Sequence, residues 1–387
     1  MPIQTRQLMQ MDICIKKVTG KADLKKFIRF NYEMYKDNLY SVPDLYEDML
    51  NTFSDKNPAM AFCDAEYYLA YRGDKIVGRV VAIINRRANE RWGKRTVRFG
   101  WIDFVDDPEV SKALLCAVED FGKAHGMEEL EGPLGFTDMD AEGMLLDGYD
   151  LPGTMATIYN YPYYPRHMEE MGLEKAADRV EFRMVVPDKV PDKMVRISEI
   201  VKKKYNLHTT KLTKKKIADE NYGQRIFDLI NEGYKDLFGF VALTQDQIDQ
   251  YVKTYLGLLN LEMVSAIETA DNELIGIGIS MDSLSRALQK AKGKLFPFGW
   301  YHLLKALKGR HPDTVDLLLV AIKPEYQNKG VNALLFTDLL PIYIRNGYTY
   351  CESNPELELN TAVQKQWEYF EVAHTRRRRC FKKTITH

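Results

Sequence analysis

The sequence predicts a mixed α/β protein made of two domains in tandem. Both halves of the chain show the same order of patterns, which reads strand, helices, hairpin, long strand, helix, strand. The stretch VVPDKVPDKM (185–194) lies between the halves, and its prolines exclude a helix interior or a central strand. Because 387 residues exceed one ordinary core, we expect a domain at 1–186, a linker at 187–194 and a domain at 195–387.

Alternation of apolar and polar residues predicts the strands of the first half, and a 3.6-residue period predicts its helices. Gly73–Asp74 is a hairpin signal between two strands. Pro108 suits the first turn of a helix, and Gly126 suits its end. The expected elements are a strand at 13–19, a helix at 21–37, a strand pair within 65–84, a strand at 96–107 and a helix at 108–126.

The second half repeats this order. Thr244 is a plausible helix cap, and Asp271–Asn272 marks a hairpin turn. The run TVDLLLVAI is apolar almost throughout, which is typical of a central strand buried on both faces. The expected elements are a strand at 208–213, helices at 221–237 and 244–260, a hairpin within 262–280, a strand at 314–322 and a helix at 331–348.

Composition excludes several classes of protein. The formal net charge of −1 gives no overall basic field for nucleic acid. The five cysteines are scattered and never spaced as CxxC, which predicts reduced thiols, no metal site and a cytoplasmic protein. The N-terminus lacks an apolar core of signal-peptide length, and no apolar run approaches the roughly 18–20 residues of a membrane helix.

The stretch VAIKPEYQNKGVNALL (320–335) places a polar loop between the long strand and a helix. Pro324 cannot donate to a ladder, so the sheet must open here. Gly330 permits backbone conformations closed to other residues. Amides at a helix start, the helix dipole and Lys329 together favour a phosphate or pyrophosphate. On composition alone, an ordinary strand-to-helix turn explains the loop equally well.

This stretch resembles the acyl-CoA-binding segment of the GNAT acyltransferase superfamily, in which a strand, a proline and a (Q/R)-x-x-G-x-(G/A) loop open a helix that holds the CoA pyrophosphate. Gln327 and Gly330 match that pattern, and Asn332 departs from its small final residue. The resemblance extends to a bacterial family of tandem GNAT proteins through FGWIDFVDDPEV (99–110), the stretch 131–173 and ESNPELELN (352–360).

The resemblance implies an enzyme that transfers an acyl group directly from acetyl-CoA or another acyl-CoA to a small amine or amino-acid-like acceptor. It implies that the strand backbone at Val320 to Ile322 contacts the acyl carbonyl. The residues that it implies for CoA binding are Val320, Ile322, Gln327, Asn328, Lys329, Gly330, Val331, Asn332 and Asn360.

A general base is useful because a lysine-like amine has a pKa near ~10.4. Among the carboxylates after the helix, Glu352 is the first candidate and Glu358 the second, although a structural role fits either as well. The tyrosine of the superfamily pattern, counted from Asn360, falls on Trp367, and Tyr369 lies two residues further on. The tyrosine's absence keeps a non-catalytic acyl-CoA sensor open as an alternative.

The first half departs from the pattern. Its long strand runs straight into the helix at Pro108 without a glycine loop, and Asp103, Asp106 and Asp107 crowd the place of a pyrophosphate. Carboxylates repel an anion there. We expect the first half to have lost its CoA site and to serve as scaffold.

Two basic stretches remain. The segment 281–314 carries seven basic residues and no acid between Arg286 and Arg310, interleaved with large apolar residues. We interpret it as an amphipathic insertion packed on the sheet; a lid over a long acyl chain, or a surface helix that touches a membrane or an acidic carrier, are the alternatives. The stretch TRRRRCFKK (375–383) predicts a terminal strand with alternate arginines on opposite faces.

Overall fold

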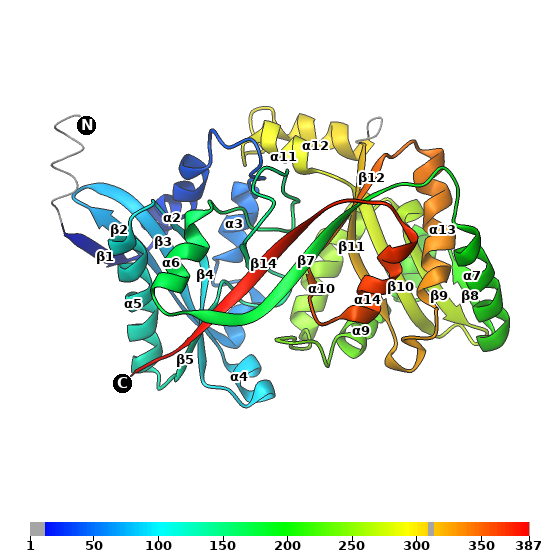
Figure 1. Ribbon diagram of the computed structural model, residues 1–387, viewed down its shortest axis with the longest axis horizontal. Coiled ribbons are helices and arrows are strands. Elements are labelled where there is room, and N and C mark those ends of the chain that lie inside the picture. Colours follow the sequence, from blue (N-terminus) through cyan, green and yellow to red (C-terminus); the bar gives the residue numbers. More distant parts are fainter. Residues whose placement is uncertain (1–11, 309–312, 387) are drawn as a thin grey trace. The chain divides into compact units, whose positions relative to one another are not determined.

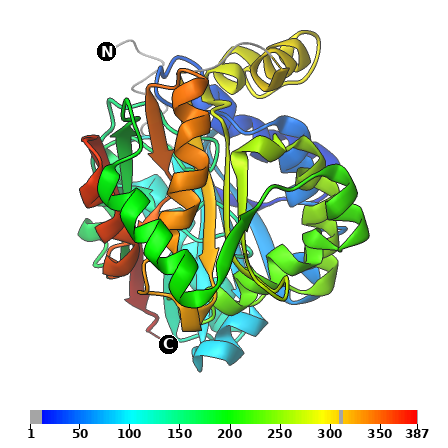
Figure 2. The same cartoon turned by 90° about the vertical axis from the view of Figure 1, so that its right-hand side faces the viewer.

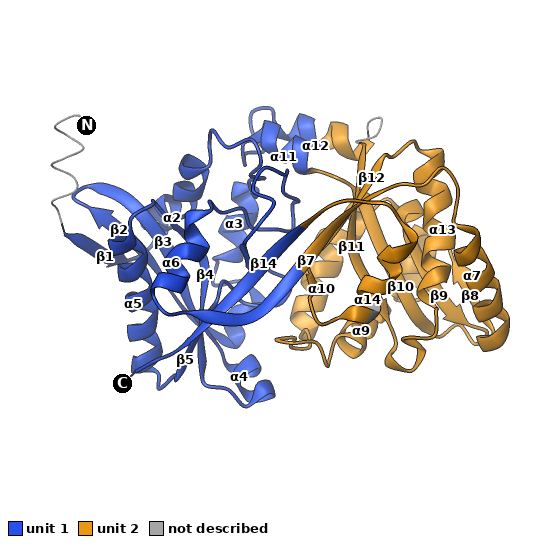
Figure 3. Ribbon diagram, viewed as in Figure 1, with its two compact units in different colours: residues 1–179, 285–303, 376–387 blue, residues 180–284, 304–375 orange. Residues whose placement is uncertain are grey.

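The computed structural model describes residues 12–308 and 313–386. The chain forms two compact units that do not coincide with its halves (Figure 3). Unit 1 consists of residues 1–179, 285–303 and 376–387, and unit 2 of 180–284 and 304–375. The stretch predicted as a linker lies in unit 2, where α7 begins at Asp192.

Unit 1 is a mixed sheet with helices on both faces (Figure 1). One face packs on α5 and α6, and the other on α2 and α3. The strands lie in the order β1 (Ile13–Lys17), β2 (Cys63–Arg72), β3 (Lys75–Asn85), β4 (Thr96–Phe104), β5 (Glu129–Gly132) and β14 (Val372–Thr384), with β6 (Met144–Leu145) paired to β14. The helices are α2 (Lys21–Met34), α3 (Tyr46–Thr52), η1 (Pro58–Ala61), α4 (Arg86–Trp92), α5 (Pro108–Ala124), α6 (Tyr163–Glu170), α11 (Ser285–Ala291) and the start of α12 (Gly299–Lys308).

Unit 2 has the same plan. Figure 2 shows α13 and α7 side by side on one face of its sheet, and α9 packs on the other. The strands lie in the order β7 (Glu174–Val185), β12 (Tyr350–Ser353), β11 (Thr314–Ile322), β10 (Leu274–Asp282), β9 (Val264–Thr269) and β8 (Leu207–Thr210), with β13 (Glu356–Leu357) paired to β7. The helices are α7 (Asp192–Tyr205), α8 (Lys214–Asp219), α9 (Tyr222–Gly233), α10 (Gln245–Tyr255), η2 (Leu256–Leu258), η3 (Leu261–Met263), η4 (Pro324–Tyr326), α13 (Asn332–Arg345), α14 (Thr361–Gln364) and η5 (Lys365–Tyr369).

The last strand of each half ends in the unit formed mainly by the other half: β7 ends in unit 2 and β14 ends in unit 1. The end of β7 pairs with β12, with Arg183 opposite Glu352. The end of β14 pairs with β5, with Phe381 opposite Gly132. The predicted alternation in β14 is confirmed, because Arg376 is buried and its neighbour Arg377 is only partly so. The C-terminal strand therefore completes the sheet of the first half.

Turns and caps follow the local signals. Gly73 and Asn272 both adopt positive φ, at 59° and 62°, in the two hairpin turns. Thr244 and Gln247 form a capping box at the start of α10. The strand predicted at 314–322 has the same bounds in the structure, because an apolar run stops at Pro324.

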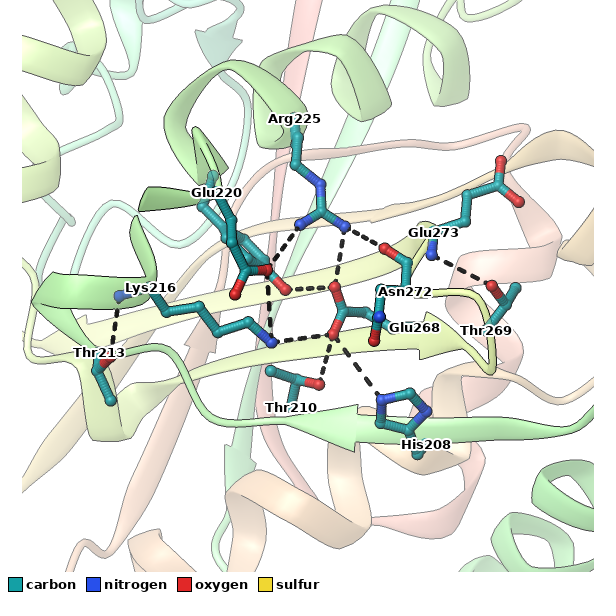
Figure 4. Close-up of polar contacts among 11 residues, drawn as sticks. His208, Thr210, Thr213, Lys216, Glu220, Arg225, Glu268, Thr269, Asn272 and Glu273 are labelled. Carbon is teal, nitrogen blue, oxygen red and sulfur yellow. Dashed lines mark hydrogen bonds and ion pairs between the residues drawn. The ribbon is translucent and has the colours of Figure 1, made fainter. Parts of the chain in front are cut away.

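A buried carboxylate holds the outer strands of unit 2 to α8 and α9 (Figure 4). Glu268, at the end of β9, is fully buried. Burial alone would raise its pKa, but hydrogen bonds from surrounding donors outweigh that effect and lower the pKa to about 2. The donors are Thr210 Oγ1 at 2.6 Å, Tyr222 Oη, Arg225 at 2.9 Å and Lys216 Nζ at 3.3 Å.

Replacing Glu268 with Gln is expected to destabilise unit 2 by about 3 kcal/mol at neutral pH, because Lys216 and Arg225 lose their buried counter-charge. The pKa is lowered in the folded state, so this stabilisation is present above the unfolded value of 4.5 and is lost as the pH falls toward 2. Thermal unfolding followed across that range should show wild type and variant converging at low pH.

The control is Glu262→Gln, since Glu262 forms an exposed pair with Arg345 and should change stability by well under ~1 kcal/mol. A Glu268→Gln variant as stable as wild type at neutral pH would contradict the role of this cluster.

Candidate active site

The two central parallel strands of unit 2 part halfway along. β11 and β12 pair from Thr314 with Tyr350 to Leu317 with Ser353, and pairing stops there although β11 continues to Ile322. The side chain of Asn354 follows β12 and donates to the Leu318 carbonyl at 2.5 Å. Beyond Leu317, β11 therefore has no pairing with β12, and an opening lies between the two strands.

A bulge and a tyrosine shape the edge of β11 at this opening. Leu318 is an extra residue, because Ile279 pairs with Leu319 and the next residue of β10 pairs with Leu317. The hydroxyl of Tyr234, which ends α9, donates to the Val320 carbonyl at 2.6 Å. The Val320 carbonyl thus has a side-chain partner, and burial raises the pKa of Tyr234, so its phenol stays protonated.

The loop after η4 is built to present amides at the start of α13. Asn328 and Gly330 both adopt left-handed conformations, with φ of 58° and 77°. Within residues 12–308 and 313–386, no acceptor is found for the backbone N–H groups of residues 328–331. Successive free amides beside left-handed residues at a helix start form an anion-binding concavity.

The side chains of the loop brace it and add positive charge. Gln327 Nε2 donates to the Ile322 carbonyl at 2.9 Å, which closes the turn on the end of β11. Lys329 is exposed, and its Nζ lies 5.4 Å from the centroid of the Tyr205 ring and 5.8 Å from that of Tyr326. Asn332 donates to Gln366 Oε1 at 3.2 Å, which ties the first turn of α13 to η5.

A carboxyl group with a strongly raised pKa lies in the same region. Burial raises the pKa of Glu356 to about 8, and a hydrogen bond from Trp367 Nε1 at 3.0 Å opposes that shift. Glu356 is close enough to act electrostatically on Tyr234, the tyrosine that contacts Val320. Glu356 lies in β13, two residues after Asn354, whose side chain donates to the Leu318 carbonyl of β11.

An apolar crevice lies beside the point where β11 and β12 part. Leu317, the last paired residue of β11, and Trp367, the partner of Glu356, both line it. Its remaining lining comes from β7 and the residues after it, β12, α13 and the end of η5: Met184, Val185, Val186, Pro187, Phe336, Leu340, Tyr343, Cys351 and Phe370. Its volume is about 10 Å³, room for about one water molecule, so it is a small apolar gap beside the opening.

Of the two carboxylates ranked first from sequence, Glu352 lies on β12 one residue before the last pair with β11, opposite Asp316, and Glu358 lies after β13. Glu352 is 4% exposed and pairs with Arg183, Nε to Oε1 at 2.7 Å, on the sheet itself. The strand predicted after the helix is confirmed as β12, and the Glu352 carboxylate has Arg183 as an ion-pair partner. Glu358 is partly exposed beyond β13, where its backbone carbonyl accepts from Gln364 at 3.1 Å.

Two further predicted site residues, Tyr369 and Asn360, lie in the stretch after β13. Tyr369 packs against the core cluster of β12, α13 and Trp367, and Lys193 Nζ of α7 lies 4.8 Å from its ring centroid. Asn360 precedes α14 without a side-chain cap. Tyr234 was not found from sequence, because nothing local in NEGYKDL distinguishes a tyrosine that reaches a strand from one that packs.

Unit 1 has its own helix cap where unit 2 has the loop. Asp107 Oδ1 accepts from the Glu109 amide at 3.0 Å and Oδ2 pairs with Arg72 at 2.6 Å. Asp103 pairs with Arg79 at 2.7 Å. A carboxylate of the chain thus occupies the helix start at which an anion would otherwise bind. The scaffold role of the first half stays a prediction.

Comparisons with known proteins bear on this site. The chain is 28% identical over 392 aligned residues to protein YghO of Escherichia coli strain K12, covering 99% of this chain and 98% of that protein. It is 24% identical over 384 residues to the bacterial ceramide synthase of Caulobacter vibrioides, covering 97% and 98%. No family model matches the chain.

Solved structures identify the fold. A tandem GNAT protein from the clavulanic acid biosynthesis pathway aligns over 97% of this chain and 99% of its own, with a TM-score of 0.54 and 12% identity. A GCN5-related glucosamine N-acetyltransferase region of a fungal multi-domain β-N-acetylglucosaminidase aligns over 96% of this chain and 38% of its own, with a TM-score of 0.55 and 12% identity. The chain therefore has the tandem GNAT fold, as the motif in the second half predicts.

The helices give no sign of a membrane span. Among the residues that the structure describes, no helix is both long enough and apolar enough to cross a bilayer.

Proposed function

We propose that the protein is an acyl-CoA-dependent N-acyltransferase whose reaction takes place in unit 2. The observation that carries this proposal is the opening between β11 and β12, which has the amide loop of 327–331 at the end of β11 and Glu356 beside it. The loop would bind the diphosphate of CoA, and Lys329 would add a formal positive charge. The thioester end of the ligand would lie at the opening, along the unpaired edge of β11.

The chemistry follows from these positions. The nitrogen of the amine attacks the thioester carbonyl, so a C–N bond forms and the C–S bond breaks. Negative charge develops on the carbonyl oxygen, and the Val320 N–H, on the same strand edge as its carbonyl, is the donor that we assign to it. CoA leaves as a thiolate, which needs little acid catalysis because a thiol has a pKa near ~8.5.

We assign to Glu356 the role of the general base that removes a proton from the amine. A base works best when its pKa lies near the working pH, and that of Glu356 is about 8. Trp367 lies at the position where the superfamily pattern has tyrosine, and its Nε1 donates a hydrogen bond to the Glu356 carboxylate. In this proposal the tryptophan therefore has a catalytic use, because it positions the base. That use favours an enzyme over a non-catalytic sensor. Tyr234 acts as a positioning residue that fixes the edge of β11.

The acyl group and the acceptor have two candidate classes. Short-chain transfer to a small amine is one, and the glucosamine N-acetyltransferase region among the structural neighbours is of that kind. A long acyl chain and a long-chain amine form the other class. The relative named as a ceramide synthase aligns along 97% of this chain, and a ceramide is an amide of this kind. The alignment with that relative along nearly the whole chain favours the long-chain class.

A panel of acyl-CoA esters from acetyl to palmitoyl, each with small amines and with a long-chain amino alcohol, tests the proposal. Release of CoA thiol should match amide formation one to one, and we expect the highest kcat/KM with long acyl chains. Thermal shift on the same esters reports binding separately, because a ligand at ~100 times its Kd adds about 2.7 kcal/mol. Binding without thiol release across the panel would identify a sensor, and activity only with acetyl-CoA would reject the long-chain class.

A further inference from the structure

The segment that joins α11 to α12 exposes large aromatic side chains. Phe296 is 74% exposed and Phe298 70% exposed, and Trp300 and Tyr301 follow them on the surface. A soluble surface rarely gathers four large apolar side chains within six residues unless they meet a partner. The interpretation as an insertion packed on the sheet accounts for the buried residues of α11 but not for these aromatic residues.

Lysines alternate with this exposed surface. Lys290, Lys292 and Lys294 are exposed and lie just before Phe296, and α12 continues with exposed Lys305. No ion pair of these four lysines is found in the described part of the chain. We call residues 290–301 the aromatic-lysine segment. It combines a net positive charge with aromatic side chains and carries no acid.

The aromatic-lysine segment belongs to unit 1 and is hydrogen-bonded to its first half (Figure 3). Gln289 Nε2 donates to the carbonyls of Leu39 at 2.9 Å and Ser41 at 3.1 Å, and the Gly293 carbonyl accepts from the Tyr46 amide at 2.9 Å. A Cβ at Gly293 would lie 2.5 Å from the Tyr32 ring, so the backbones approach closely there. The side chain of Leu39 is itself 79% exposed and enlarges the apolar surface beside α11.

We propose that the aromatic-lysine segment docks the protein on an anionic lipid bilayer. Aromatic rings are favoured at the headgroup level of a bilayer, and lysines beside them reach outward to anionic headgroups. The segment contains both the aromatic rings and the lysines. Trp300 Nε1 donates to the Pro297 carbonyl at 2.9 Å, so the ring can enter the bilayer interface and keep this hydrogen bond. An acidic carrier protein would use the lysines but would leave Phe296 and Phe298 without a reason for exposure.

Sedimentation of the full chain with vesicles tests this proposal without any CoA ester, so its outcome is separate from that of the acyltransferase proposal. Vesicles of phosphatidylcholine with added phosphatidylglycerol should bind the protein, vesicles of phosphatidylcholine alone should bind it far less, and salt should weaken binding. Lys292→Glu with Lys294→Glu should weaken partitioning by at least about 30-fold, at roughly 1 kcal/mol for each lysine lost. Phe296→Ser with Phe298→Ser should weaken it by more than ~10-fold.

Matched controls separate docking from general charge and general hydrophobicity. Lys214→Glu with Lys215→Glu makes the same charge change on exposed lysines at the start of α8, and Leu258→Ser removes an exposed apolar side chain from η2. Both should bind vesicles as wild type does. Trp emission should shift to shorter wavelength on binding, and Trp300→Phe should remove that shift while binding persists.

Three results would overturn the proposal. The first is a wild-type protein that sediments with neither kind of vesicle, which would leave an acidic protein as the partner to seek. The second is equal binding by the Lys292→Glu/Lys294→Glu variant and by its Lys214→Glu/Lys215→Glu control. The third is a blue shift that survives Trp300→Phe in full.

Discussion

Replacing Glu356 with Gln is expected to lower kcat by about 10²–10⁴-fold while acyl-CoA binding stays as in wild type. Gln keeps the volume of Glu and can still accept the hydrogen bond from Trp367 Nε1, but it cannot take a proton from the amine. The measurement is steady-state thiol release, with thermal shift by the same acyl-CoA as the binding control.

The pH profile gives this prediction a second readout. Since the pKa of Glu356 is about 8, its basic form accumulates as the pH rises through 8, and the wild-type rate should rise with it. The same raised pKa means that the folded state holds a proton that the unfolded chain releases above 4.5, so wild type should lose stability relative to Glu356→Gln between about pH 5 and 8. A merely structural carboxyl would give the stability trend without the change in rate.

The two other carboxylates serve as comparisons. Glu358→Gln alters a partly exposed neighbour in the same stretch and should leave the rate within about an order of magnitude of wild type. Glu352→Gln should instead cost stability, because Arg183 loses a buried partner. If Glu352→Gln or Glu358→Gln removes the alkaline limb of the profile and Glu356→Gln retains it, the base is not Glu356.

Replacing Gly330 with Glu is expected to abolish acyl-CoA binding. The residue adopts a φ of 77°, which penalises any side chain, and its Cβ would lie 3.1 Å from Ile197. The new carboxylate would also stand among the amides of the loop and repel a diphosphate. In wild type, ligand at ~100 times its Kd should add about 2.7 kcal/mol of stability, and in the variant this increment should vanish.

Gly347→Glu is the matched control, because Gly347 follows the other end of α13 with a φ of 74° and open space around its Cβ. Both variants pay for a left-handed backbone, so both should unfold at a somewhat lower temperature. Only Gly330→Glu should lose the shift with acyl-CoA. An unchanged shift in Gly330→Glu would remove the loop from the proposed site.

The sequence predicts the local frame of unit 2 because the signals there are local. The apolar run of β11, Pro324 and the helical period after Gly330 each act within a few residues. The structure shows the strand with the predicted bounds and the helix at Asn332–Arg345, inside the predicted 331–348. Glu356 could not be ranked in this way. Its burial depends on the two-residue strand β13 and its pairing with β7, a strand more than a hundred residues away in the sequence.

The same limit applies to the two basic stretches. Alternation in 375–383 predicts a strand and its two faces, but it carries no information on which sheet accepts that strand, and the answer is the sheet of the first half. An amphipathic pattern in 285–308 is also the same whether the apolar face packs or is left open. The structure divides it, with Leu288 and Leu303 buried and Phe296 and Phe298 on the surface.

The position of residues 376–387 in unit 1 has a consequence for synthesis on the ribosome. The first half emerges early, but the edge of β5 stays without its neighbour until β14, some 240 residues later along the chain, has left the exit tunnel. An open strand edge attracts other chains, so the nascent protein must protect that edge throughout the translation of the second half.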